Sequence, residues 1–222
     1  MVELSPTEAR ALGVLIEKAT TTPEQYPLSL NALVNGCNQK NNRSPVMSIS
    51  EDDAFAAVEG LREKQLAIRV DQVGSRVHKY KHTAGETLRC SAEQLAVLAE
   101  LLMRGPQTLG ELRGRASRMS PLATLDDVKT MIRGLMEQQE PLVRELPPAP
   151  GTRAETYAQL LAPDAHPIDS QPQTDVAVTS GSSGAIGIGE RVSALENEVA
   201  SLREALRKLA AAVGEADPIE MK

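Results

Sequence analysis

The chain has 222 residues, a mass of 23.8 kDa and a formal net charge of −6. This length leaves room for two small domains and an appendage. Aromatic residues make up only 2% of the chain, and Trp is absent. The cores must therefore be aliphatic, and modules that stack single-stranded bases on exposed rings are disfavoured.

The acidic excess lies in the C-terminal quarter. Residues 1–90 hold 11 Lys and Arg against 11 Asp and Glu, residues 91–163 hold 8 against 9, and residues 164–222 hold 5 against 10. Nucleic-acid binding by the first two segments would thus depend on local basic patches. The N-terminus lacks a signal-peptide pattern, and no run is long enough to cross a bilayer, so we expect a cytoplasmic protein without membrane association.

The first predicted element is a helix near the N-terminus. Ser5 can cap its first turn, Pro6 suits that turn, and Glu8 completes a capping box. Apolar residues at helical spacing predict a second helix from Leu30 to Cys37. A polar stretch from Gln39 to Pro45 separates it from the next element.

A third helix is predicted to begin after Ser50, with Asp53 three residues on. Its expected buried stripe consists of Phe55, Val58 and Leu61. Beyond this helix the apolar period changes from about 3.6 to 2, which indicates strands.

The strand-like segment predicts a β-hairpin. Ile68 and Val70 alternate with polar residues, Gly74-Ser75 suits a type II′ turn, and Arg76 to His82 runs back. Three helices followed by such a hairpin are typical of a winged helix-turn-helix domain.

The same order occurs a second time. Two motifs recur in the same order. Gly-Leu-x-Glu begins at Gly60 and again at Gly134, which is 74 residues later, and the Arg-x-x-x-Tyr motif that follows each copy recurs after 77 residues. The second copy is completed by helix starts at Ser91, Thr108 and Thr124 and by strands over 142–146 and 153–160. The sequence therefore predicts a mainly α fold with small β-hairpins (α+β), made of tandem winged helix-turn-helix domains at residues 1–88 and 89–162. Whether they form one rigid body is left open.

Two motifs carry a family resemblance. They are Asn38-Gln39-Lys40-x-Asn42-Arg43-x-Pro45-Val46 and Gly74-Ser75-Arg76-Val77-x-Lys79-Tyr80. With them, roughly residues 3–162 resemble the YceH-type family of bacterial proteins. The resemblance implies a tandem winged-helix fold and supplies neither a reaction nor assigned functional residues.

The C-terminal segment follows a different pattern. Residues 163–189 read as a flexible linker, residues 190–214 as a coiled-coil helix and residues 215–222 as a disordered tail. The helix carries an unbroken heptad series that predicts a parallel homodimer: Val192, Leu195, Val199, Leu202, Leu206, Leu209 and Val213. The alternative is a single amphipathic helix that folds back onto a winged domain.

No residue pattern points to catalysis. His78 and His82 alternate on a predicted strand without an acidic or Cys partner nearby in sequence, so a zinc pair is disfavoured. Cys37 and Cys90 fit no metal or redox spacing. We expect a non-enzymatic protein with neither a cofactor nor a metal.

The leading interpretation is binding of double-stranded DNA, as in a transcription regulator. The candidate contacts are polar or basic residues near predicted helices and in the first wing: Asn38, Gln39, Lys40, Asn42, Arg43, Arg76, Lys79, Lys81, Arg113, Arg115 and Arg118. Acidic residues at the start of each third helix would repel phosphates, which argues against simple docking. The alternative is therefore a protein-interaction scaffold built from winged-helix domains and a coiled-coil dimer.

Overall fold

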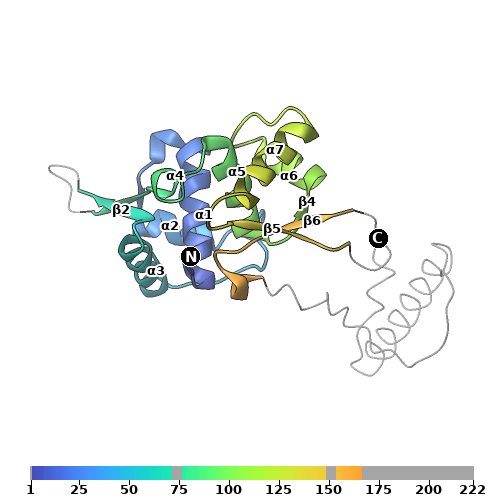
Figure 1. The fold of residues 1–222 in the computed structure, drawn as a ribbon. Coiled ribbons are helices and arrows are strands. Elements are labelled where there is room, and N and C mark those ends of the chain that lie inside the picture. Colours follow the sequence, from blue (N-terminus) through green and yellow to red (C-terminus); the bar gives the residue numbers. More distant parts are fainter. Residues whose placement is uncertain (1, 72–76, 149–153, 167–222) are drawn as a thin grey trace, which may run out of the picture. The chain divides into compact units, whose positions relative to one another are not determined.

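The computed structural model describes residues 2–71, 77–148 and 154–166 (Figure 1). The described part has the predicted α+β composition, with helices and two small antiparallel sheets. The predicted linker beyond residue 166, the heptad helix and the tail lie outside the described residues. Among the described residues, no helix combines the length and apolar character that a membrane crossing requires.

The first repeat contains three main helices and a three-stranded sheet. Its elements in chain order are α1 (Pro6–Thr21), a 3-10 turn (Pro23–Gln25), β1 (Leu28–Ser29), α2 (Leu30–Cys37), α3 (Glu51–Glu63), β2 (Ala67–Val70) and β3 (Lys79–His82). The short helix α4 (Ala84–Thr87) leads into the second repeat.

The second repeat has the same order of elements. They are α5 (Ala92–Arg104), β4 (Gln107–Thr108), α6 (Leu109–Ala116), α7 (Leu125–Met136), β5 (Val143–Leu146) and β6 (Thr156–Gln159), followed by a 3-10 turn (Pro163–Ala165). Ser5, Ser50, Ser91, Thr108 and Thr124 each begin a helix with a complete capping box, as the sequence predicted.

The two sheets have equivalent topology. Their strand orders are β1-β3-β2 and β4-β6-β5, all antiparallel. Tyr80 and Tyr157 occupy the same central-strand position, opposite Leu28 and Gln107 respectively, and both are buried. The edge strands β1 and β4 were not predicted, because two residues are too few to show an alternating pattern.

The repeated glycines are explained by close contacts between helices. A Cβ on Gly60 would overlap Oε1 of Glu8, and one on Gly134 would lie 2.5 Å from Nε2 of Gln94. Glu8 and Gln94 are the capping-box residues of α1 and α5. Glycine therefore lets the third helix of each repeat approach the N-terminus of the first.

The predicted buried stripe of α3 is wrong at Phe55. This side chain is 49% exposed, whereas Val58 and Leu61 are fully buried. The buried stripe runs through Ala54 instead. Phe55 lies one residue further on, which is about 100° around the helix and therefore off the stripe.

The two repeats share one continuous core. Buried apolar residues of both copies form a single cluster, with α1 packed along α5 at its centre (Figure 1). A Cβ on Gly13 would lie only 2.7 Å from Cγ of Met103, so the helices cross closely there. The backbone amide of Leu4 also donates to the carbonyl of Leu161 at 2.6 Å. Within the described residues, the two repeats therefore pack together as one compact unit.

Candidate nucleic-acid interface

The polar loop after α2 is largely occupied by contacts within the protein. The Asn38 side-chain amide donates to the Ile49 carbonyl at 2.9 Å and accepts from the Ile49 backbone amide at 2.8 Å. The Ser44 amide donates to the carbonyl of Met103 at 2.9 Å, which ties the loop to α5. Asn42 has a positive φ of 63° and contacts Arg104 through its side chain. The loop motif of the family resemblance therefore contributes to the junction between the repeats.

Arg43 is a buried structural residue, contrary to its place among the surface candidates. Its Nη2 lies 2.6 Å from Oε2 of Glu17 and 2.9 Å from Oε1 of Gln39, while Nε donates to the Gly36 carbonyl at 3.1 Å. The guanidinium side chain has no exposed surface. It is held by a carboxylate and is not presented to a phosphate.

Glu17 and Glu100 form the centre of an ion-pair cluster between the repeats. Arg118 lies 2.5 Å from Glu17 and 2.7 Å from Glu100. Arg104 Nε lies 3.0 Å from Glu100 Oε2, a distance that fits an ion pair although the angles do not fit a hydrogen bond. Arg118, a predicted DNA contact from the second copy, thus links α1 of one repeat to α5 of the other.

Burial alone would raise the pKa of Glu17. The hydrogen bond and the charge of Arg43, together with the charge of Arg118, outweigh this desolvation and lower the pKa below its ordinary value. Arg10 lies on α1, as Glu17 does, and also contributes to the junction. Its guanidinium donates to the carbonyls of Cys37 and Pro45 at 3.2 and 2.7 Å.

The two remaining arginine candidates of the second copy differ in their surroundings. Arg115 donates to the buried Gln107 at 2.7 Å and pairs with Glu111 at 3.2 Å. Arg113 is exposed on α6. Of the three candidates near α6, only Arg113 therefore offers its charge to solvent without an ion pair to a carboxylate of the described residues.

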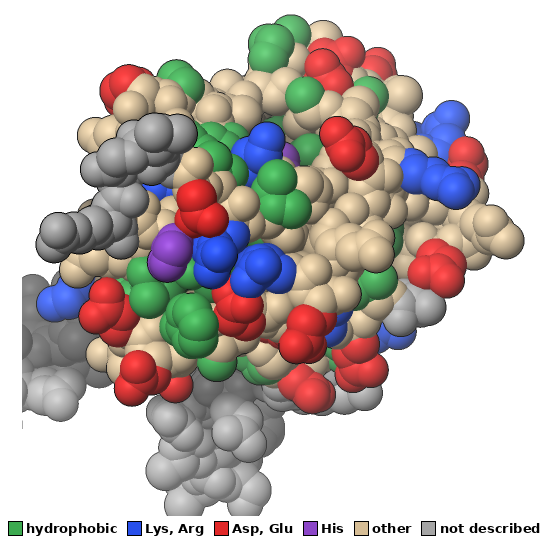
Figure 2. All heavy atoms as spheres, turned by 90° about the vertical axis from the view of Figure 1, so that its left-hand side faces the viewer, with side chains coloured by type: hydrophobic (Ala, Val, Ile, Leu, Met, Phe, Trp, Pro, Cys, Tyr) green, Lys and Arg blue, Asp and Glu red, His purple; other side chains and the backbone are tan. Residues whose placement is uncertain are grey.

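The β2–β3 pair presents its lysines on the outer side of the sheet. Lys79 pairs with Val70 and Lys81 with Ile68 across the β2–β3 ladder, so these four side chains share a face. Figure 2 views the side of the protein on which α3 and β2 lie, where several basic side chains lie near the centre and acidic ones lie around them. Arg76 and the Gly74-Ser75 turn lie outside the described residues.

His78 and His82 have different surroundings and do not share a metal site among the described residues. His78 Nδ1 is 2.6 Å from Oδ1 of Asp71, and this contact is the largest cause of the lowered pKa of that carboxyl. His82 packs near the ring of Tyr26, and burial, with a smaller effect of Lys81, lowers its pKa. Within the described ranges, no three His, Cys, Asp or Glu side chains are grouped so that they could hold a metal ion.

Sequence reasoning missed the outward surface of α7. Its buried stripe consists of Val128, Ile132 and Leu135. The opposite surface, called the α7 face below, consists of exposed residues at helical spacing: Asp126, Lys129, Thr130, Arg133 and Glu137. The helical spacing of Val128, Ile132 and Leu135 can be read in the sequence and could have found Lys129 and Arg133, since both fall outside that stripe.

The equivalent surface of α3 has different chemistry. At an offset of 74 residues, the α3 face consists of Asp52, Phe55, Ala56, Glu59 and Glu63. Phe55 thus stands where the second repeat has Lys129, and Glu59 where it has Arg133. Helix α3 holds five acidic residues against one basic residue, a net charge of −4, whereas α7 holds two of each and is neutral.

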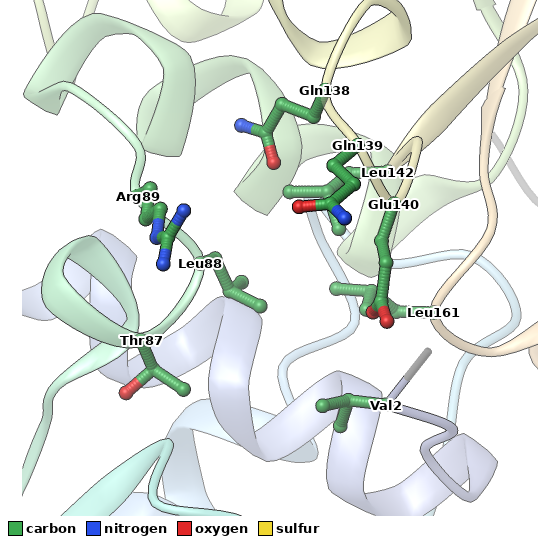
Figure 3. Close-up of a pocket in the computed structure, with 9 residues that line it drawn as sticks. All are labelled: Val2, Thr87, Leu88, Arg89, Gln138, Gln139, Glu140, Leu142 and Leu161. Carbon is green, nitrogen blue, oxygen red and sulfur yellow. The ribbon is translucent and has the colours of Figure 1, made fainter.

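A pocket of about 490 Å³ opens between the N-terminal segment, the residues after α4 and the loop after α7 (Figure 3). Its apolar lining includes Leu88, Leu142 and Leu161, and its polar lining includes Arg89 and Gln138. In Figure 3, Gln138 and Arg89 approach the pocket from different segments. The leucines of the lining belong to the shared core, so the pocket lies at its edge.

Comparison with known proteins places the chain in a family. A model described as "Protein of unknown function, DUF480" matches residues 4–152 and thus spans both repeats. The chain belongs to this family. It is 49% identical to a UPF0502 protein of Pelobacter propionicus over 205 residues, covering 90% of this chain and 93% of the relative. A UPF0502 protein of Geobacter sulfurreducens is 46% identical, and the match covers 90% of this chain and 90% of that relative. These matches confirm the resemblance to an uncharacterised bacterial family.

Proposed function

We propose that this protein is a non-enzymatic double-stranded DNA-binding protein whose main contact is the α7 face. The observation that carries the proposal is the placement of Lys129 and Arg133, four residues apart and exposed on the third helix of the second repeat. In winged helix-turn-helix proteins the third helix enters the major groove, and the wing contacts the backbone. The order of elements in each repeat, three helices followed by two antiparallel strands, supports this comparison.

The α7 face combines groups that can contact both the phosphates and the base edges of a DNA duplex. Lys129 and Arg133 can contact phosphates or guanine edges, and the hydroxyl of Thr130 between them can bond a base or a phosphate. The carboxylate of Asp127 accepts from the Thr124 amide at 2.8 Å, so it is engaged in capping the helix. Exposed Arg113 and Lys81, with half-buried Lys79, would add contacts outside the groove.

The proposed contact set differs from the one drawn from sequence. Lys40 also stays in it as an exposed cation, whereas Arg43, Arg115 and Arg118 leave it because they are held by Glu17, Gln107 or Glu100.

The heptad segment supports a further proposal, a homodimer with two α7 faces. Light scattering on the full chain and on Leu202→Pro tests it: the wild type should have twice the mass of the variant, and equal masses would contradict the dimer.

Salt titration of duplex binding tests the proposed function. Affinity for mixed-sequence duplexes should fall steeply with salt, because each neutralised phosphate releases counterions. The double variant Lys129→Ala with Arg133→Ala should bind more weakly and reduce the salt slope by about two units, one for each phosphate that is no longer neutralised. The matched control is Phe55→Ala with Glu59→Ala, which should leave the slope unchanged. Equal binding by both double variants would contradict the proposal.

A protein-interaction scaffold is the second candidate function. It is favoured by one observation, the acidic α3 face with an exposed aromatic ring.

A further inference from the structure

The α3 face exposes the only Phe of the chain. Phe55 is 49% exposed in a protein whose aromatic content is 2%. The position does not require an apolar side chain for folding, because the equivalent residue of the second repeat is Lys129 on a helix with the same kind of cap and an equivalent buried stripe. Packing of the repeat therefore does not explain why an aromatic ring faces solvent here.

Acidic side chains surround this ring. Asp52 and Glu63 are exposed on the same face, and Glu59 is partly exposed while paired with Arg62. Figure 2 shows acidic side chains interspersed with apolar ones on this side of the protein. The α3 face is therefore an apolar centre with an acidic border.

A hollow beside α3 adds shape to this surface. It has a volume of about 440 Å³ and lies between α3 and the start of α1, with Thr7, Asp53 and Ala56 among its lining residues. Phe55 is not among these lining residues, and Ala56 is the residue of the α3 face that borders the hollow. A partner that docks on the α3 face could place a side chain in this hollow beside Ala56.

We propose that the α3 face is a docking site for another protein, through a segment that presents apolar side chains flanked by Lys and Arg. Charge complementarity selects this occupant, because the helix has a net charge of −4. The same charge repels a nucleic-acid backbone and an anionic membrane surface. It also opposes a second copy of this chain in an α3-to-α3 contact. Exposed aromatic residues are frequent anchors of protein interfaces.

Photo-crosslinking in the native cells tests this proposal. Phe55 is replaced by p-benzoylphenylalanine, and the same residue is placed at Lys129 as the matched control. We expect a polypeptide adduct at position 55 that is absent at position 129. Mass spectrometry of the adduct should identify an attached segment in which Lys and Arg outnumber Asp and Glu.

A synthetic peptide with the sequence of that segment provides the quantitative test. It should bind the full chain, and Phe55→Lys should lower its affinity by about tenfold or more, the effect of removing an interface anchor. Asp52→Lys should lower it as well, whereas Leu125→Ser, at a residue 47% exposed on α7, should not. Thermal unfolding of each variant checks that the fold is kept.

Several outcomes would overturn the docking site. They are the absence of an adduct at position 55, an adduct with a second copy or with nucleic acid, an acidic attached segment, and unchanged peptide affinity of Phe55→Lys. Duplex binding by the α7 face is measured separately on the same proteins, so failure of the docking site and failure of the proposed function are distinguishable.

Discussion

The third helices of the two repeats begin with the same kind of capping box and approach the first helix through equivalent glycines, Gly60 and Gly134. Their outward faces differ. The α3 face centres on Phe55 among carboxylates, whereas the α7 face carries Lys129 and Arg133. Capping and burial restrain one side of the helix, and the solvent-facing side is free to change. A repeated fold can therefore hold two binding surfaces of different chemistry.

The ion pairs of Glu17 hold the two repeats together, and with them the two faces. Glu17→Gln breaks these ion pairs and should have the largest effect on stability. The variant leaves Arg43 and Arg118 near a neutral group in the buried junction. Breaking a buried pair in this way costs about 3–5 kcal/mol of unfolding free energy. Chemical denaturation measures it.

Glu63→Gln is the matched surface control for Glu17→Gln. Its side chain is exposed at the end of α3 and should change stability by no more than about 0.5 kcal/mol. Similar losses of stability in both variants would show that the junction does not hold the repeats together.

A second pair of variants separates the two sides of α3. Leu61→Ala removes a fully buried side chain and should cost about 2–5 kcal/mol. Phe55→Ser should cost less, about 1–2 kcal/mol, because only half of the ring is buried. Thermal and chemical unfolding compare them. A large loss of stability in Phe55→Ser would mean that the ring supports the core and would remove the reason for proposing docking.

The pH dependence of stability gives a smaller effect, to which His82 of the first repeat and His166 after the second both contribute. Burial lowers the pKa of His82, with Lys81 as a second cause. A depressed histidine pKa contributes stability that is present above the unfolded value of about 6.5 and is lost as the pH falls through the folded pKa. The unfolding free energy should therefore decrease below about pH 6.5. His82→Gln should remove part of this decrease and leave the part that His166 contributes, and an unchanged profile would exclude His82 as a source.

Periodicity and capping patterns predicted most of the fold. The repeat offset placed both third helices, and Ser and Thr caps located their first turns. The two-residue strands β1 and β4 escaped because they are too short to have a period. Phe55 was misplaced because three apolar residues at spacing three suggested a stripe, while the smaller Ala54 is the residue that faces the core.

The candidate surface was harder to predict than the fold. Basic residues in a polar loop look available in sequence, yet Arg43 reaches Glu17, 26 residues earlier, and Arg118 reaches Glu17 and Glu100. Such long-range pairing leaves no local pattern. Lys129 and Arg133 were missed although their spacing marks them as outward, because the acids at the start of the same helix indicated a surface that repels phosphates.

Exchange of the two faces tests the difference between the repeats most directly. One protein carries Phe55→Lys with Glu59→Arg, and the other carries Lys129→Phe with Arg133→Glu. Salt-dependent duplex affinity is then measured for both and for the wild type. We predict that the second protein loses affinity and salt dependence, while the first keeps or increases both. Loss of duplex binding in the first protein, with the second unchanged, would contradict the assignment of the duplex to α7.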